Sequence, residues 1–256
     1  MKKNLKFIFL IFALSLVLLS LTSCDTSSAL SAPGVTFSVS PADQPEQVTT
    51  GVQLLVLLTV LSLAPSILIL GTSFTRIVIV ISMIRNAIGT PTIPPNQVVV
   101  GLSLLLTFFV MGPVYTQIND NAIKPYINKQ INQTTAINNS IEPVREFMFK
   151  QTREKDIQLF MEMRGDTQPA TLADIPTSAL FPAFVISELK TALTMGFLLY
   201  IPFLIIDLLI SSILLSLGMM MLPPSLVSLP FKILLFVMVD GWYLITRSLM
   251  LSFGGG

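Results

Sequence analysis

Long apolar runs with few charges make up most of the chain. No charged residue occurs from Gln47 to Thr75 or from Asn86 to Asn119. Between Lys190 and Lys232 the only charge is Asp207, and a last apolar run extends to Phe253. A membrane-spanning helix needs about 20 apolar residues, so the pattern predicts four stretches that are each long enough to cross a bilayer.

The first apolar run is longer than one bilayer requires. A helix from Val52 to Ile88 would extend about 55 Å at 1.5 Å per residue, and it would contain Pro65 and Arg76. Such a helix has to break, tilt or continue out of the hydrocarbon layer.

Two proline pairs divide the apolar runs into hairpins. Pro94-Pro95 and Pro223-Pro224 each follow one apolar run and precede another, and a Pro-Pro pair can begin a helix but not continue one. We therefore predict an all-α integral membrane protein with one long helical hairpin over 51–117, a polar helical segment over 118–187 and a second hairpin over 188–256. With the N-terminus outside, both turns face the cytoplasm and the polar segment faces the periplasm, in agreement with basic residues near the turns.

The polar segment contains one clear amphipathic element. Between Pro143 and Arg164, apolar residues at helical spacing alternate with a charged face, so we predict a helix that Ser140 caps and Gly165 ends. The apolar positions are Val144, Phe147, Met148, Phe160 and Met161. The segment is either a lid packed on the membrane hairpins or a binding surface for an exported substrate.

The N-terminus has the layout of a secretory signal peptide, which we predict over residues 1–31. Three lysines precede an apolar run from Phe7 to Leu21, and small residues follow. Cleavage after Ser31 fits this pattern, and so does cleavage before Cys24, because Leu21-Thr22-Ser23-Cys24 resembles a bacterial lipobox in which the cysteine is lipidated. Residues 32–50 are rich in Ser, Pro, Thr and Gln and predict a disordered linker. The mature N-terminus then faces the periplasm, which indicates a multi-pass protein of the bacterial inner membrane.

The composition supports a membrane protein and disfavours an enzyme. The 256 residues are 52% hydrophobic and 11% charged, with a mean hydropathy of +0.78, whereas soluble domains carry about 25% charged residues. There is no histidine and Cys24 is the only cysteine, which excludes Cys/His zinc sites, intramolecular disulfides and imidazole-dependent catalysis. A net charge of +1 argues against a nucleic-acid binder. The sequence shows no Gly-rich phosphate loop, nucleophile elbow or metal-ligand cluster, so we expect no cofactor and no enzymatic activity.

Charged residues within or at the edges of the apolar runs are candidate functional positions. They are Arg76, Glu188, Lys190, Asp207, Lys232, Asp240 and Arg247. Each costs at least about 2.5 kcal/mol at mid-bilayer, so we expect them to be paired and shielded by protein, which in turn predicts oligomerisation. We predict an ion pair between Glu188 and Lys232 of neighbouring copies. Asp207 and Asp240 can alternatively pair with Arg76 or Arg247.

A methionine triplet lies in the turn of the second hairpin. Met219, Met220 and Met221 stand between Gly218 and the Pro223-Pro224 pair. Consecutive side chains on a helix point about 100° apart, so the triplet cannot serve one helix face, whereas on a loop the three side chains can project into a shared space. Methionine repacks around irregular surfaces. The loop therefore either fills gaps at a helix end or closes a channel that parts around varied passengers.

Two dense blocks of sequence resemble a known family. The first block comprises Leu63–Leu68, Thr72–Ile77, Ile84–Ala87 and Pro94–Val98, and the second comprises Pro182–Lys190, Pro202–Asp207, Gly218–Pro224, Leu229–Lys232 and Val239–Trp242. From Gly51 to Phe253 the chain closely resembles the FliP/SctR family of type III secretion export-gate proteins, whose FliP branch serves the flagellum. The residues between Lys124 and Pro176 match only loosely.

The resemblance implies an assembly and a function. Five copies would join small FliQ-like and FliR-like subunits in a helical, cone-like gate at the flagellar basal body. Unfolded flagellar subunits would pass through its centre, where Met219, Met220 and Met221 would form the constriction. The family's apolar helices would leave the bilayer plane and pack on one another, in agreement with the overlong first run.

Two other functions also fit the residues. A proton-coupled small-molecule transporter would use Asp207, Asp240 and Arg247 as a relay, with a substrate pocket at broken helices. A purely structural scaffold would leave the channel lining to another chain. A transporter would take up small molecules as an isolated protein, whereas a gate subunit needs partners and passes polypeptide.

Overall fold

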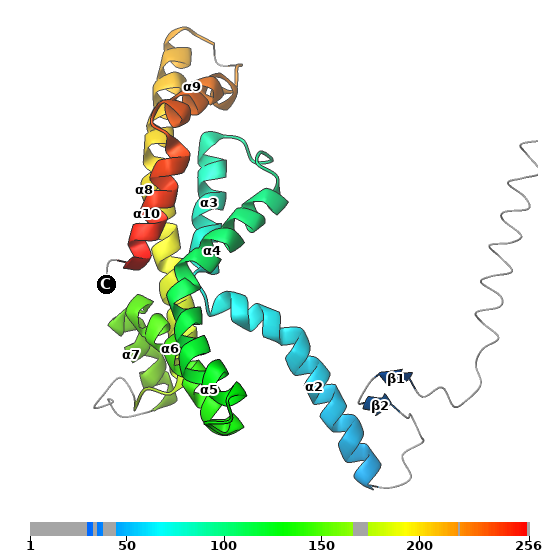
Figure 1. The fold of residues 1–256 in the computed structure, drawn as a ribbon. Coiled ribbons are helices and arrows are strands. Elements are labelled where there is room, and N and C mark those ends of the chain that lie inside the picture. The colour runs from blue at the N-terminus through cyan, green and yellow to red at the C-terminus, as the bar shows by residue number, and fades with distance from the viewer. Residues whose placement is uncertain (1–29, 33–34, 38–44, 166–173, 220, 255–256) are drawn as a thin grey trace, which may run out of the picture. The chain divides into compact units, whose positions relative to one another are not determined.

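The computed structural model describes residues 30–32, 35–37, 45–165, 174–219 and 221–254, which belong to two compact units, Met1–Val60 and Leu61–Gly256 (Figure 1). The predicted signal peptide up to residue 29, including Cys24, lies outside the described residues.

Two short strands and the start of a helix form the described part of the first unit. Strands β1 (Leu30–Ala32) and β2 (Val35–Phe37) pair antiparallel. Helix α2 (Pro45–Leu70) begins inside the predicted linker 32–50 and ends in the second unit. Proline is favoured in a first helical turn because it has no N–H to leave unpaired. The other described elements are helices, so the predicted all-α class is confirmed.

The overlong first run is broken, which is one of the three expected alternatives, but the break does not fall at its proline. Pro65 stays inside α2, and the break falls at residues 71–73, before α3 (Phe74–Ile88). Gly71 is a poor helix former compared with the aliphatic residues on either side. Helix α3 ends at Gly89, whose φ of 90° is a left-handed conformation that glycine adopts readily.

The first proline pair leads into a long helix with a change of pitch. Helix α4 (Asn96–Ile118) continues through a π-helical turn, η1 (Asn119–Ile123), into α5 (Lys124–Ile127). Together they form a continuous helix of 32 residues.

The amphipathic element of the polar segment is two helices rather than the single one predicted. Helix α6 (Gln133–Gln151) and helix α7 (Glu154–Arg164) are separated at Thr152 and Arg153, both of which have extended backbone. Asn132 caps α6 by accepting from the Thr135 amide at 2.8 Å, so the predicted cap Ser140 is wrong and lies inside α6. Gly165 ends α7 as predicted, with a φ of 72°.

The second hairpin consists of one very long helix and a bent arm. Helix α8 (Thr177–Ser216) has 40 residues, or about 60 Å at 1.5 Å per residue. It starts before the predicted boundary at residue 188. Its first turns carry the buried Ala179, Leu180, Ala183 and Phe184, which belong to the core shared with the polar segment. Helices α9 (Pro224–Met238) and α10 (Gly241–Gly254) form the arm and meet at an angle of 63°.

Fewer helices than predicted are long enough to cross a membrane. In the described ranges, Asn96–Ile127 and Thr177–Ser216 are long and apolar enough, and α9 with α10 adds a third span if the bent pair is counted as one. The break in the first run leaves α3 with 15 residues and α2 with an apolar part, Leu54–Ile67, that is shorter than a span.

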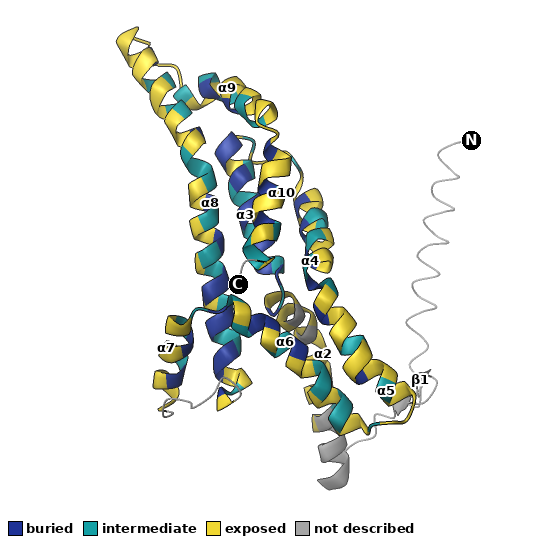
Figure 2. Cartoon of the chain, turned by 60° about the vertical axis from the view of Figure 1, so that its left-hand side comes forward, coloured by how far each residue is buried: buried dark blue, intermediate teal, exposed yellow. Residues whose placement is uncertain are grey.

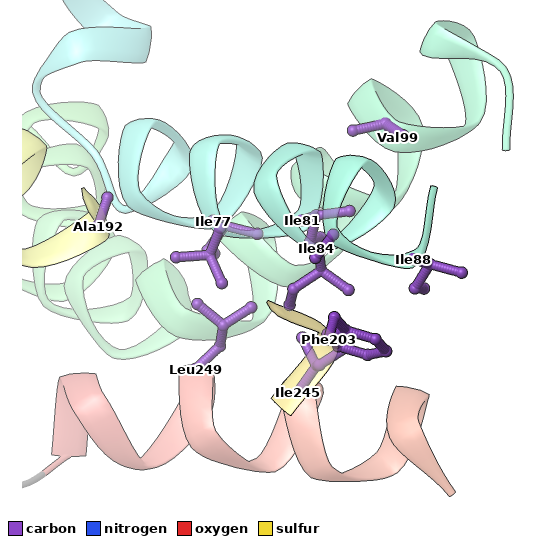
Figure 3. Packing of buried hydrophobic residues seen from close by; sticks show 11 residues of the cluster. Ile77, Ile81, Ile84, Ile88, Val99, Ala192, Phe203, Ile245 and Leu249 are labelled. Atoms are coloured by element: carbon purple, nitrogen blue, oxygen red, sulfur yellow. The ribbon is translucent and has the colours of Figure 1, made fainter. Parts of the chain in front are cut away.

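Helix α3 lies in the middle of one of the two apolar cores of the described residues. Its stripe of Ile77, Ile81, Ile84 and Ile88 packs with residues of α4, α8 and α10. Figure 3 shows these isoleucines close to Leu249 and Ile245 of α10 and to Phe203 of α8. In Figure 2, α3 is mostly buried, whereas α9 and the adjoining end of α8 are largely exposed.

The polar segment has its own core against the long helices. Phe147 and Met148 of α6 and Met161 of α7 pack with Met111 of α4 and Phe184 of α8. This packing is what the lid interpretation expects, because the apolar face of α6 and α7 is covered by the hairpins.

We predict that the closest approach of α3 and α8 is set by a glycine. An added Cβ at Gly196 of α8 would stand 2.4 Å from the Met83 sulfur of α3, whereas at Gly101 of α4 nothing lies within 4 Å. Gly196→Leu should lower the thermal unfolding midpoint of the purified protein, since overpacking typically costs about 1–3 kcal/mol. The control Gly101→Leu should not lower it, because leucine is a better helix former. Adding Met83→Ala to Gly196→Leu should recover part of the loss, and no recovery would contradict the contact.

Candidate functional site

Six of the seven charged residues predicted within or at the edges of the apolar runs belong to two clusters and to an exposed pair of positions, whereas Lys190 is exposed on α8 and belongs to neither cluster. We call the first the Arg76 node, which consists of Arg76, Gln151, Glu188, Ser252 and Phe253. The second is the Asp207 cluster of Asp207, Ser228 and Lys232. The exposed pair is Asp240 and Arg247.

The Arg76 node is a fully buried ion pair surrounded by further hydrogen bonds. Arg76 is 2% exposed and Glu188 0%. The guanidinium donates from Nε to Glu188 Oε2 at 2.9 Å and from Nη2 to Glu188 Oε1 and to Gln151 Oε1. Its Nη1 donates to the carbonyl and the hydroxyl of Ser252, both at 3.0 Å. The face of the guanidinium lies over the Phe253 ring, 4.0 Å from the ring centroid.

All five N–H groups of Arg76 therefore have acceptors, the full donor capacity of a guanidinium. The node joins α3, α6, α8 and the end of α10, because each of these helices supplies one or more of its residues. A buried ion pair is tolerated only when its remaining polar groups are also satisfied, and this node meets that condition.

The neighbouring Ser187 attaches the start of α7 to α8. Its hydroxyl donates to Asp156 Oδ2 at 2.5 Å and accepts from the Arg153 amide at 3.0 Å. The polar segment is thus held to the membrane helices by hydrogen bonds as well as by its apolar core.

The Asp207 cluster joins α8 to α9. Lys232 Nζ donates to Asp207 Oδ2, and Ser228 Oγ donates to Asp207 Oδ1, each at 2.6 Å. The Lys232 side chain is 6% exposed and that of Asp207 29%. Because Ser228 and Lys232 are one helical turn apart, one carboxylate holds two successive positions of α9.

Glu188 and Lys232, predicted to pair between neighbouring copies, each have another partner within the chain. The structure gives Glu188 to Arg76 and Lys232 to Asp207 within one chain. The sequence carried no information on which helices are neighbours, so these partners within the chain were not predicted, and the pair between copies stays a prediction.

Asp240 and Arg247 are exposed, and neither pairs with Asp207 in the described part of the chain. Asp240 lies at the bend between α9 and α10 with a φ of 50°. Arg247 lies on α10, on the side away from the buried Ile245 and Leu249. The structure therefore does not bring the three residues of the predicted relay together.

The proline pairs stand directly at the starts of the helices that they precede. Pro95 is the residue before α4, and Arg85 Nη1 donates to the Pro94 carbonyl at 3.1 Å. Pro223 is the residue before α9, and Pro224 is the first residue of that helix.

The methionine loop, residues 218–223, lies between α8 and α9. Gly218 has a φ of 72°, which ends α8 in a left-handed turn. Met219 is 44% exposed and Met221 97%, while Met220 lies outside the described residues. The described methionines therefore do not fill a gap at the helix end within one chain.

The described residues contain no group of three or more carboxylates or cysteines placed to hold a metal ion. The geometry of the site is that of helix joints and an exposed loop.

Comparison with known proteins identifies the family. The sequence profile of the FliP family matches residues 57–249. The chain belongs to the FliP family. The resemblance seen in the two sequence blocks is thereby confirmed.

Relatives of this FliP-family chain match it over most of its length. The flagellar biosynthetic protein FliP of Bacillus subtilis is 55% identical over 212 residues, which are 83% of this chain and 96% of the relative. The protein of the same name from Pectobacterium carotovorum is 55% identical over 205 residues, 80% of each chain. That of Borreliella burgdorferi is 41% identical over 256 residues, 99% of this chain and 100% of the relative.

The uncharged hydrogen-bond partners of the buried charges were not predicted from the sequence of this FliP-family chain. Arg76 donates hydrogen bonds to Gln151 and Ser252, and Ser228 donates to Asp207. Only Ser228 had a visible signal, since it stands one helical turn before Lys232 in an apolar helix.

We expect the Arg76 node to be a major contributor to the stability of this FliP-family chain. Arg76→Met leaves the Glu188 carboxylate buried without its cation, and breaking a buried pair in this way costs about 3–5 kcal/mol. The thermal unfolding midpoint should fall far more than in the control Lys150→Met. Lys150 and its partner Glu146 are 63% and 52% exposed, and surface pairs contribute about 0–1 kcal/mol.

The double variant Arg76→Met/Glu188→Met provides the check on this prediction. Removing both charges should destabilise the protein less than the sum of the two single changes, because neither charge is then left uncompensated. Strictly additive effects would show that the two side chains do not interact.

Proposed function

We propose that this chain is a pore-forming core subunit of the flagellar type III protein export gate. In this role it passes unfolded flagellar subunits across the bacterial inner membrane during flagellum assembly, without enzymatic activity. Its membership of the FliP family supports the proposal, as do relatives of similar length that are named flagellar biosynthetic proteins.

The observation that carries the proposal is the exposure of the methionine loop at the end of a long apolar hairpin. Met221 projects almost completely from the chain, and Met219 is half-exposed. Methionine side chains are unbranched and adapt to irregular surfaces. A ring of such loops, including Met220, is suited to close a pore and to part around polypeptides of varied sequence.

The exposed surface of the helices supports assembly with other chains. Leu105, Phe108 and Phe109 of α4 are 69%, 61% and 75% exposed, so the membrane helices have large uncovered apolar faces. Asp240 and Arg247 are exposed on the same group of helices, and such charges are costly in lipid. We propose that about five copies, together with FliQ-like and FliR-like subunits, cover these faces at the flagellar basal body, the arrangement expected for the family.

No observation favours the small-molecule transporter. Both Asp207 oxygens are engaged by Lys232 and Ser228, and a proton relay needs a carboxylate that is within reach of the next group. The structural scaffold is the stronger alternative, since it also needs partners.

The export role predicts contact between a passing polypeptide and the loop. A photo-crosslinker at Met221 should capture a stalled export substrate in the assembled gate. The control position Met163, at the end of α7, is 74% exposed and should not capture it. Crosslinks to partner subunits alone, with none to Met221, would favour the scaffold.

The seal predicts a leak when the methionines are shortened. Replacing Met219, Met220 and Met221 together by alanine removes the side chains that fill the closed pore. The resting gate should then conduct ions, while secretion of flagellar subunits persists because the passage is wider. Met163→Ala is the matched control. A triple variant with wild-type conductance and normal assembly would remove the sealing role.

A further inference from the structure

The Asp207 cluster is the last directional contact between α8 and α9 before the methionine loop. Asp207 stands about three helical turns from the loop, and its carboxylate receives Ser228 and Lys232 of α9. In the described part of 190–254 this is the one ion pair. The two helices are therefore fixed to each other at this level by groups with defined geometry.

Beyond the cluster, hydrogen bonds stay within each helix. Ser211, Ser212 and Ser216 of α8 donate to carbonyls one turn earlier in the same helix. The loop backbone bonds are also local: the Met219 amide donates to Leu214 and the Leu222 amide to Met219. In the described residues between Asp207 and Ser228, no hydrogen bond therefore crosses from α8 to α9.

Apolar packing at the tip is also sparse. Leu214 is buried, but its neighbours are not. The side chains of Ile213, Leu215, Leu217, Leu222 and Leu226 are 54%, 63%, 67%, 43% and 69% exposed. The tip, by which we mean the end of α8, the methionine loop and the start of α9, therefore has few contacts within the chain. Segments with few buried contacts move most easily.

We propose that Asp207, Ser228 and Lys232 are positioning residues that fix α9 on α8 and thereby hold the methionine loop in its sealing arrangement. This inference rests on the sealing role proposed above. The two oxygens of one carboxylate hold successive turns of α9, so the cluster opposes both rotation of α9 about its axis and sliding of α9 along α8.

A spin label on the loop tests the positioning role without reference to transport. The label is attached at Met221→Cys in full-length protein carrying Cys24→Ser, extracted as the assembled complex. Lys232→Met should narrow the lines of the electron paramagnetic resonance spectrum, because the labelled loop then moves more freely. The charge swap Asp207→Lys/Lys232→Asp should restore the original line shape. A label at Met163→Cys should be unchanged in every variant.

A milder variant keeps the test valid if Lys232→Met does not assemble. Ser228→Ala retains the ion pair and removes one of the two attachments, so it should give a smaller narrowing at Met221. Unchanged spectra in both Lys232→Met and Ser228→Ala, or in Ser228→Ala alone where only this variant assembles, would overturn the positioning role.

Ion conductance per assembled gate links the cluster to the seal. Lys232→Met should raise it to the level of the triple-alanine loop variant. Arg76→Met breaks a buried pair elsewhere, and should reduce the amount of gate without changing the conductance of each one. If the triple-alanine variant leaks and Lys232→Met does not, the positioning role fails alone. If neither the triple-alanine variant nor Lys232→Met conducts ions, although the label at Met221 becomes more mobile in Lys232→Met, the sealing role fails.

Discussion

A guanidinium buried in an apolar chain has to find all of its acceptors within the protein. This constraint fixes how the helices around the Arg76 node are arranged, and we call this end of the hairpins the base. Arg76 lies in the first turn of α3 and donates hydrogen bonds to acceptors on α6, α8 and α10. Apolar packing brings helices together but does not by itself fix their register. The hydrogen bonds of Arg76 do so, because they align three other helices with one side chain.

Contacts are unevenly distributed along the second hairpin. Near the Arg76 node, α8 is part of two apolar cores and is attached to the polar segment through Ser187. Towards the methionine loop only the Asp207 cluster and a few buried side chains remain. A firmly packed base with a loosely held methionine loop suits the constriction proposed above, since the loop can move while the base keeps its place.

Much of the architecture followed from the sequence because it depends on local chemistry. The proline pairs and Gly165 marked helix boundaries that the structure also has. Ser140 is not a cap, because α6 continues on both sides of it. Asn132 provides the cap upstream. The apolar pattern alone did not reveal the break at residues 71–73, because small and polar residues there are too few to interrupt it.

The candidate site was predicted in composition but not in pairing. The residues with intramembrane charge were visible, since each is conspicuous in an apolar run. Their partners depend on which helices are adjacent, and one sequence carries no such information. Hence Glu188 and Lys232 of neighbouring copies were assigned to each other, and the partners that each has in its own chain were not predicted.

The π-helical turn η1 has a consequence for the helix that it interrupts. Its backbone closes a wider ring, in which the Lys124 amide donates to Asn119, five residues earlier. A single wide turn adds one residue without ending the helix, so every side chain after it is rotated by about 100° relative to an uninterrupted spiral. Asn139 of α6 donates to the Asn121 carbonyl at 3.0 Å within this turn. Removing one residue from 119–123 would therefore swing Pro125 and Tyr126 to a different azimuth while leaving α4 as it is.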